Sequence, residues 1–400
     1  PMVRDATWRR GVLAGAWTMM LFAAAVQIMP ASVLPLVMDD LAVGPGRAGW
    51  LVSASLITPA LLSLFVGVAL DRFASFRVVM AGTLVLVVAN VWGWWAALAG
   101  DFVSLVVTRL LAGAAIATLW NAGATVVGGV FTGKRAATAM GVFTTAPPLG
   151  YAIGQFVPPF VAEAGGWELN FLVFAVLSLL AFLAYALVGG RNAAGTPEER
   201  PTRAEFRAVF TSRTVWVVAL MSFVGYSLHL FFNSWMPTYL SEEFGMALTA
   251  SGALAALFPA MGVLSRLSGG WLSDRVFARR RKPIPLLAFG VSAPLVVLVS
   301  MASTTLALVA LLALSGYFIQ LSIGLFYTYV RELVDDRVAG SAVAVLSTAS
   351  FVGASSSPVI AAALFTRTGT FAASFGYAAA LALAGFALAL FAPEPARGNA

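Results

Sequence analysis

The chain has 400 residues, of which 60% are hydrophobic and 10% charged, with a formal net charge of +7 and no cysteine. Soluble domains carry about 25% charged residues, so this composition excludes an ordinary water-soluble protein and predicts a surface that faces lipid. Without cysteine and with one histidine, thiol chemistry and most metal sites are excluded. We expect an all-α membrane protein with no enzymatic activity, no cofactor, no metal and no nucleic-acid partner.

Long apolar segments follow one another along the chain, without the period-2 alternation of barrel strands. About 20 apolar residues in a helix cross the hydrocarbon core, where backbone polar groups must be satisfied internally. Twelve spanning helices are predicted, at 11–37, 47–70, 77–99, 102–130, 136–163, 168–190, 213–240, 248–273, 283–302, 304–330, 339–366 and 370–392. Between the sixth and seventh, the polar segment 191–212 is predicted to be a linker without apolar periodicity.

Basic residues gather on one side of the predicted spans. All of the 24 Lys and Arg except Arg47, Arg109, Arg266 and Arg367 lie in the termini, the linker or every second loop. By the positive-inside rule this side is cytoplasmic. We therefore expect a multi-pass protein of the plasma (inner) membrane with both termini in the cytoplasm. Termini on the same side require an even number of spans, which agrees with twelve.

The two halves of the chain repeat at an offset of 203 residues. This offset aligns Gly67 with Gly270, Asp71 with Asp274, Arg72 with Arg275, Arg77 with Arg280, Gly113 with Gly316 and Gly150 with Gly353. A shared glycine-rich composition explains the glycines but not the Asp-Arg pairs. The repeat predicts two six-helix bundles in the same orientation, at 1–190 and 213–400, related by a pseudo-two-fold axis.

The aligned Asp-Arg segments resemble the G-x-L-x-D-R-x-x-R-R signature of the major facilitator superfamily. The copy at 270–280 is the cleaner of the two, whereas the copy at 67–77 departs from the signature around Ala69 and Leu70. The resemblance covers the whole chain and implies twelve helices and transport by alternating access. It also implies a conformational lock, because a carboxylate at a helix end can cap a neighbouring helix and pair with arginine. The lock residues would be Gly67, Asp71, Arg72, Arg77, Gly270, Asp274, Arg275 and Arg280; the alternative is that these charges only set topology.

Two arginines lie inside predicted spans, Arg109 and Arg266. A charge at that depth costs at least about 2.5 kcal/mol unless it is paired or hydrated. Arg109 and Gly113 match the family's R-x-x-x-G pattern, and the resemblance implies that this span lines a central cavity. Each arginine is a candidate anion contact. The alternatives are a structural Arg109 bonded to backbone carbonyls and a packing or gating role for Arg266.

Polar side chains at helical spacing mark further candidates. All 17 Asp and Glu lie at span ends or in loops, so an interior with guanidiniums and no carboxylate favours an anion. The other predicted substrate contacts are Gln27, Asn121, Tyr151, Gln155, Tyr226, His229, Asn233, Tyr317, Gln320 and Tyr327. For any one of them the alternative is an interhelical hydrogen bond. Because an imidazole ordinarily titrates near neutral pH, His229 is also the candidate proton carrier.

Two functions remain in competition. The first is a secondary transporter, acting as a monomer, that moves a small organic anion with H+ or Na+ as a candidate coupling ion. The second is a multidrug or amphiphile exporter, because 141–154 partly resembles the antiporter motif of drug exporters and Trp17, Trp120 and Trp235 are aromatic cavity candidates. Exporters of cations usually need a membrane carboxylate, which counts against the second. The segments 141–154 and 347–358 lack the asparagine-glycine core of nitrate porters, which disfavours nitrate.

Overall fold

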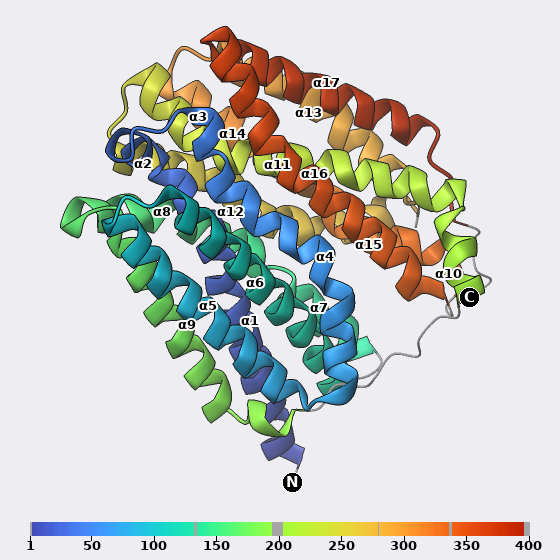
Figure 1. The fold of residues 1–400 in the computed structure, drawn as a ribbon. Helices are drawn as coiled ribbons and strands as arrows, with labels where there is room; N and C mark the ends of the chain where they lie inside the picture. The colour runs from blue at the N-terminus through green and yellow to red at the C-terminus, as the bar shows by residue number, and fades with distance from the viewer. Residues whose placement is uncertain (1, 132–133, 194–202, 279, 336–337, 396–400) are drawn as a thin grey trace. The chain divides into compact units, whose positions relative to one another are not determined.

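The computed structural model describes residues 2–131, 134–193, 203–278, 280–335 and 338–395, nearly all of which lie in helices (Figure 1). Contacts divide the chain into two compact units. Unit 1 consists of Pro1–Glu198 and Pro237–Ala256, and unit 2 of Glu199–Met236 and Leu257–Ala400. The predicted division at the linker, with bundles at 1–190 and 213–400, stays a prediction.

The helices follow the predicted order. The first half contains α1 (Met2–Ser32), α2 (Leu34–Asp40), α3 (Pro45–Ala48), α4 (Trp50–Arg72), α5 (Ser75–Leu98), α6 (Phe102–Val130), α7 (Lys134–Phe143), α8 (Ala146–Gly165), α9 (Leu169–Leu187) and the 3-10 turn η1 (Gly190–Asn192). The second half contains α10 (Arg203–Phe210), α11 (Arg213–Phe244), α12 (Leu248–Trp271), the π-helical turn η2 (Leu272–Val276), α13 (Pro283–Met301), α14 (Thr305–Leu321), α15 (Ile323–Glu332), α16 (Ala339–Thr368) and α17 (Phe371–Leu390).

Within the described ranges, ten helical segments are long and apolar enough to cross a membrane. The second predicted span corresponds to α4 and the fifth to α7 and α8, which are separated at Thr144 and Thr145. Proline explains the break, since Pro147 and Pro148 cannot donate to the preceding turn. The helices therefore occur in the order of the twelve predicted segments, and the fold is that of an all-α membrane protein.

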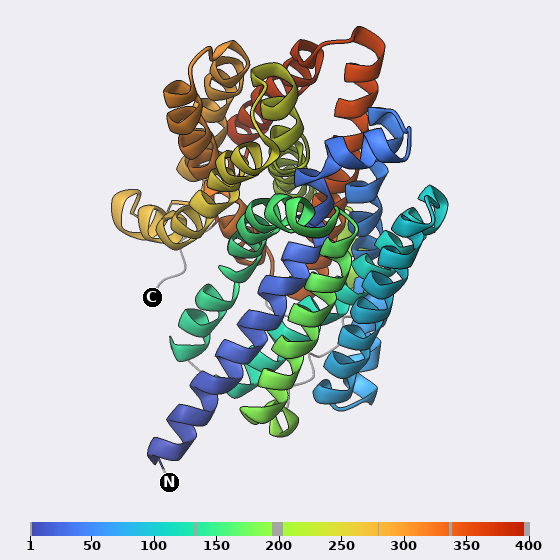
Figure 2. The same cartoon turned by 90° about the vertical axis from the view of Figure 1, so that its left-hand side faces the viewer.

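In unit 1, α1 packs against α8 and α9, while α6 packs against α4 and α5; Figure 2 shows α1 running beside α9. Glycines permit the close approaches. A Cβ on Gly113 of α6 would come within 2.8 Å of the carbonyl carbon of Ser55 in α4. Gly252 of α12 lies against the carbonyl oxygen of Gln155 in α8, where a Cβ would come within 2.6 Å. The start of α12 thereby becomes part of unit 1.

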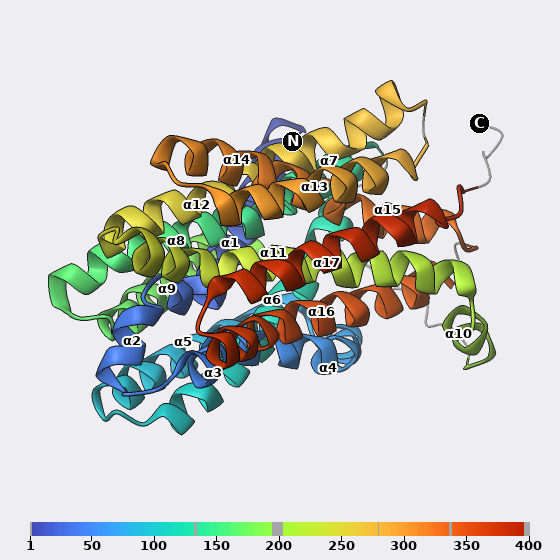
Figure 3. The same cartoon turned by 90° about the horizontal axis from the view of Figure 1, so that it is seen from above.

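In unit 2, α13 packs against α14 and α17, and α16 against α15 and α17; Figure 3 shows α13 alongside α17. The predicted repeat recurs in its packing. A Cβ on Gly316 would meet the carbonyl carbon of Phe258 at 2.9 Å, and Phe258 stands 203 residues after Ser55, the neighbour of Gly113. The same glycine contact is therefore present in both halves.

The repeat also extends to helix starts. Asp101 caps α6 by accepting from the amide of Ser104 at 3.1 Å, and Thr304 caps α14 by accepting from the amide of Ala307 at 3.3 Å. These caps are again 203 residues apart.

The linker 191–212 was expected to lack regular structure, but its end forms the short helix α10. Phe210, the last residue of α10, packs edge-on against Trp216 with 5.5 Å between ring centroids.

Candidate functional site

Arg109, predicted as an anion contact, is held by backbone carbonyls of unit 1. It is 1% exposed. Its Nε donates to the carbonyl of Leu51 in α4 at 2.9 Å, and its Nη2 donates to the carbonyls of Val26 and Gln27 in α1 at 2.8 and 2.7 Å. This geometry corresponds to the structural alternative considered above, in which carbonyl dipoles neutralise the buried charge.

Gln27 and Tyr151 join the same cluster. The Nε2 of Gln27 donates to the carbonyl of Ser55 at 3.2 Å, and the hydroxyl of Tyr151 in α8 donates to its Oε1 at 2.7 Å. Arg109, Gln27 and Tyr151 thus connect α6, α1, α4 and α8. Gln155 is fully buried in α8. Asn121 is not brought into this cluster, because its amide donates within α6 to the carbonyl of Ala117 at 2.8 Å.

A second polar cluster lies in unit 2. The Nδ2 of Asn233 donates to the carbonyl of His229 at 2.8 Å and lies 3.2 Å from the ring Nδ1 of His229. The ring of Tyr226 meets that of His229 edge-on at 6.3 Å, and its hydroxyl lies 3.5 Å from that of Tyr327. Sequence spacing had suggested that these side chains from the seventh and tenth spans share a wall, and the structure brings them together.

Arg266 of α12 belongs to this second cluster. Its guanidinium lies close enough to His229 and Tyr327 to act on both electrostatically. Its Cγ lies where a Cβ on Gly324 of α15 would be 3.7 Å away, so a glycine leaves space for the arginine stem. Every unit 2 carboxylate whose side chain is described is exposed: Asp274, Glu332, Asp335 and Glu394.

The other two predicted contacts of unit 2 bond to neighbouring helices. Gln320 is fully buried, and its Nε2 donates to the carbonyls of Phe258 and Gly316 at 2.9 Å each. The hydroxyls of Tyr317 and Ser268 lie 2.8 Å apart. Both side chains therefore connect α14 to α12, as expected for interhelical hydrogen bonds between polar groups inside a bundle.

The ion pairs at the second lock segment centre on Arg281, which the motif did not single out. Its Nη1 lies 2.7 Å from Asp274 and its Nη2 2.7 Å from Glu332, and Nη1 also donates to Ser273 at 2.8 Å. These bonds to Glu332 and Asp274 raise the pKa of Arg281, so it stays charged. Its second partner, Glu332, is the last residue of α15.

The predicted arginines of that lock point elsewhere. Arg275 and Arg280 are exposed, and neither forms an ion pair with a residue whose position is described. In the first copy, Arg77 is exposed. The side chains of Asp71 and Arg72 lie outside the described part of the structure, as does the burial of Gly67, so the first lock is not described.

The segment after α17 also contacts the second lock segment, through Glu394. Glu394 accepts from the backbone amides of Arg281 and Lys282 at 3.1 Å each, at the start of α13. In return, the Nζ of Lys282 donates to the carbonyl of Leu390, the last residue of α17, at 2.6 Å. A carboxylate at a helix start and an ammonium at a helix end both oppose the helix dipole favourably.

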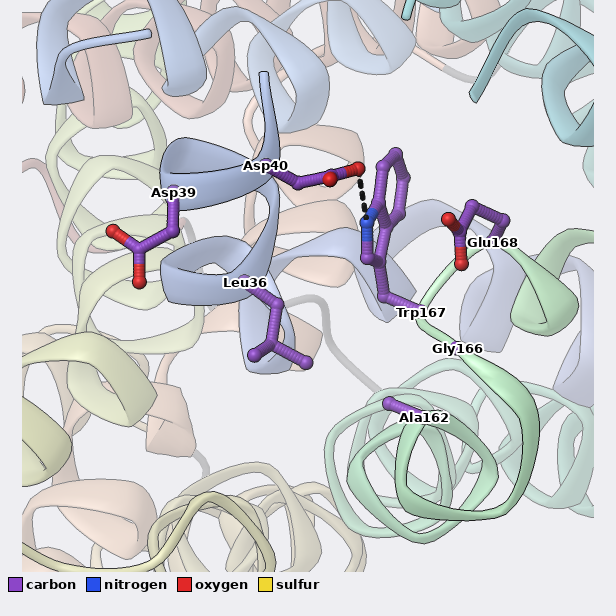
Figure 4. Close-up of a pocket in the computed structure, with 7 residues that line it drawn as sticks. All are labelled: Leu36, Asp39, Asp40, Ala162, Gly166, Trp167 and Glu168. Atoms are coloured by element: carbon purple, nitrogen blue, oxygen red, sulfur yellow. Dashed lines mark hydrogen bonds between the residues drawn. The ribbon is translucent and has the colours of Figure 1, made fainter. Parts of the chain in front are cut away.

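An open pocket lies at one end of unit 1, between α2 and the turn after α8 (Figure 4). It is lined by Leu36, Asp39, Asp40, Ala162, Gly166, Trp167 and Glu168, and Asp40 accepts from the indole of Trp167 at 3.1 Å. None of these residues was predicted as a substrate contact. Three carboxylates repel an anion, so this pocket is not the candidate anion site.

The tryptophans considered for an exporter cavity make contacts within the two units. The indole of Trp17 donates to Thr145 at 3.0 Å, and that of Trp235 to the carbonyl of Pro358 at 2.9 Å. Trp120 stacks on Phe143 with 5.3 Å between ring centroids. Each ring therefore takes part in packing.

Comparison with known proteins decides the family. Residues 16–358 match the family model described as Major Facilitator Superfamily. The chain belongs to the major facilitator superfamily. It is accordingly a multi-pass membrane transporter and not an enzyme, and the expected family and fold are confirmed.

Relatives within the superfamily are similar over most of their length. The hexuronate transporter of Bacillus subtilis is 26% identical over 87% of this chain and 86% of its own. The probable sulfoacetate transporter of Cupriavidus necator is 27% identical over 96% and 93%. A solved structure of a bacterial homolog to the human lysosomal transporter Spinster, inward-facing and occupied, aligns with a TM-score of 0.76 at 14% identity, covering 96% of this chain and 97% of that one. This superfamily structure supports the fold.

Proposed function

We propose that this protein is a secondary transporter that moves a small organic anion across the plasma membrane by alternating access. The two halves, 1–190 and 213–400, would move against each other, with 191–212 as linker and both termini in the cytoplasm. This orientation follows from the positive-inside rule. H+ or Na+ is the candidate coupling ion, and the protein would work as a monomer.

The observation that carries the proposal is the position of Arg266. Its guanidinium lies within electrostatic range of His229 and Tyr327, and Tyr226 lies beside both of these side chains. This group offers one permanent positive charge, two phenol hydroxyls and an imidazole. A guanidinium binds a carboxylate or sulfonate through parallel N–H groups, while phenols and imidazole can bond to hydroxyl groups of the solute. We assign substrate contact to Arg266, Tyr226, His229 and Tyr327 first.

The relatives support an organic anion. Hexuronate, sulfoacetate and L-galactonate, named for three of them, each combine an acidic group with a short carbon skeleton. Other relatives are named a nitrite extrusion protein, at 24% identity, a probable nitrate/nitrite transporter, at 27%, and a probable nitrate/nitrite antiporter, at 26%. We prefer organic anions because the segments 141–154 and 347–358 contain no asparagine.

The test is uptake into proteoliposomes that contain the purified full chain. Radiolabelled galacturonate, galactonate, sulfoacetate and nitrate would be compared, with a lipophilic cation as the exporter control. We expect uptake of at least one organic anion, reduced at least 100-fold in Arg266→Gln, because a lost charge-assisted pair costs about 3 kcal/mol. Arg367→Gln, outside the cluster, serves as the matched control. Transport of the cation alone, or normal uptake by folded Arg266→Gln, would refute the proposal.

A further inference from the structure

Among the helices of unit 1 that contain a proline in their interior are α1, with Pro30, and α4, with Pro59. Proline has no backbone N–H, so the carbonyl four residues earlier loses its helical hydrogen-bond donor. The carbonyls affected here are those of Val26 and Ser55. In hydrocarbon no water can replace the missing donor, and such a carbonyl must be satisfied by a neighbouring helix.

Both of these carbonyls receive a side-chain donor. Val26 accepts from Nη2 of Arg109 at 2.8 Å, and Ser55 accepts from Nε2 of Gln27 at 3.2 Å. The two donors are linked, since the same Nη2 also donates to the carbonyl of Gln27 at 2.7 Å. Arg109 therefore donates directly to the carbonyl that Pro30 leaves without a helical donor. It is linked through Gln27 to the carbonyl that Pro59 leaves without one.

The surrounding residues fix this arrangement. Nε of Arg109 donates to the carbonyl of Leu51 in α4 at 2.9 Å, so a single guanidinium connects α6 to both α1 and α4. One turn later, Gly113 lets α6 approach Ser55 closely. Tyr151 holds Gln27 from the opposite side at 2.7 Å. A guanidinium donates in several fixed directions within one plane, which the single ammonium of lysine cannot do.

We propose that Arg109 is a positioning residue, whose guanidinium replaces the hydrogen-bond donor removed by Pro30 and holds α1 and α4 to α6. Its positive charge then serves the backbone of unit 1 and not the transported solute. This assignment differs from the anion contact expected from its position in the span. The transport test of this assignment rests on the proposed function, whereas the unfolding test does not.

The first test is a double-mutant cycle on the purified full chain, read by thermal unfolding. The variants are Arg109→Gln, Pro30→Ala and their combination. In Pro30→Ala the new backbone N–H can bond to Val26, so the role of Arg109 shrinks. We expect Arg109→Gln to lower Tm by about 5 °C or more in the wild-type background and by less than half as much beside Pro30→Ala. Pro283→Ala, in the first turn of α13 where an N–H is not needed, should leave the loss unchanged.

Equal losses in all three backgrounds would overturn the proposal. If Arg109→Gln does not fold, a parallel cycle of Gln27→Leu with Pro59→Ala tests the second carbonyl in the same way. There too, additive effects count against the inference.

The second test separates positioning from solute contact. With galacturonate as probe, we expect Arg109→Lys to keep Kd within about threefold while Vmax falls at least tenfold. A Kd raised tenfold or more at unchanged Vmax would show direct anion contact and overturn the proposal. If wild-type protein binds no galacturonate or other organic anion, the proposed function fails, whereas the unfolding cycle still decides the role of Arg109.

Discussion

The guanidinium of Arg281 lies 2.7 Å from the carboxylate of Asp274, seven residues earlier in the chain. The intervening segment makes this possible, because η2 ends at Val276 and Ala278 adopts a positive φ of 51°. The chain thereby turns back before α13 begins. Asp274 consequently pairs with Arg281, which follows the 270–280 segment, and not with Arg275 or Arg280.

Replacing Arg281 should weaken the end of unit 2 at which α13 begins. Its side chain is 11% exposed and pairs with two carboxylates, so Arg281→Gln leaves both without their shared partner. Exposed ion pairs contribute little, but a well-aligned arginine network contributes more; we expect a loss of about 1–2 kcal/mol. Thermal unfolding at low and high salt measures it. Arg280→Gln is the control and should change little; equal effects of the two would contradict the pairing.

Glu394 should act as the cap of α13. Glu394→Ala removes the acceptor for the amides of Arg281 and Lys282, and we expect a loss of about 0.5–1 kcal/mol. Hydrogen exchange in the first turn of α13 should accelerate, more in Glu394→Ala than in Glu394→Gln, which keeps an acceptor oxygen. Glu163→Ala, in the last turn of α8, provides the comparison. Unchanged exchange in α13 would refute the cap.

Gly113 should not tolerate a methyl group. Its Cβ would lie 2.8 Å from the carbonyl carbon of Ser55, whereas a Cβ on Gly128 of the same helix has nothing within 4 Å. Overpacking of this kind typically costs about 1–3 kcal/mol. Gly113→Ala should therefore lower Tm, and Gly128→Ala should not. Gly316→Ala should behave as Gly113→Ala does, since it meets the equivalent carbonyl; equal stability of all three variants would contradict the packing.

The cap at Asp101 should be pH-dependent. The hydroxyl and amide of Ser104 donate to Asp101 and lower its pKa below the ordinary 3.8. A lowered folded-state pKa gives stability that is present above pH 3.8 and is lost as pH falls below it. The small Tm advantage over Asp101→Ala, on the order of a degree, should be constant near neutral pH and shrink below pH 3.8. Thr304→Ala removes an uncharged cap, and its Tm difference should not vary over this range.

Proton coupling, if it exists, should depend on His229. Among the described residues, Tyr226 packs against its ring and Arg266 lies within electrostatic range of it. His229→Gln removes the one imidazole of the sequence, which is the candidate proton carrier. We expect an imposed pH gradient to drive anion accumulation in wild-type proteoliposomes but not in His229→Gln, while counterflow exchange persists. Accumulation by the variant would exclude His229 as the proton carrier, and gradient-independent wild-type transport would exclude proton coupling.

Much of the architecture was predictable from local sequence. Span length and hydropathy depend on about 20 consecutive residues, and these predicted the helices from α5 at Ser75–Leu98 to α17 at Phe371–Leu390. The 203-residue repeat predicted that Gly113 and Gly316 are equivalent, and both meet the equivalent carbonyl. Helical spacing on two spans also predicted the grouping of Tyr226, His229 and Tyr327.

Bonding partners depended on tertiary structure. The sequence by itself determined that Arg109 lies within a span, which is a matter of counting residues along a helix. Only the fold decided that its donors meet Leu51, Val26 and Gln27, because backbone carbonyls are present at every position and the sequence does not say which of them a distant arginine reaches. In the same way, the sequence could not show which of the adjacent arginines 279–281 pairs with Asp274 and Glu332. The turn at Ala278 brings Arg281 to both carboxylates. Hydropathy is a local property, whereas the partner of a buried charge is set by residues far away in the chain.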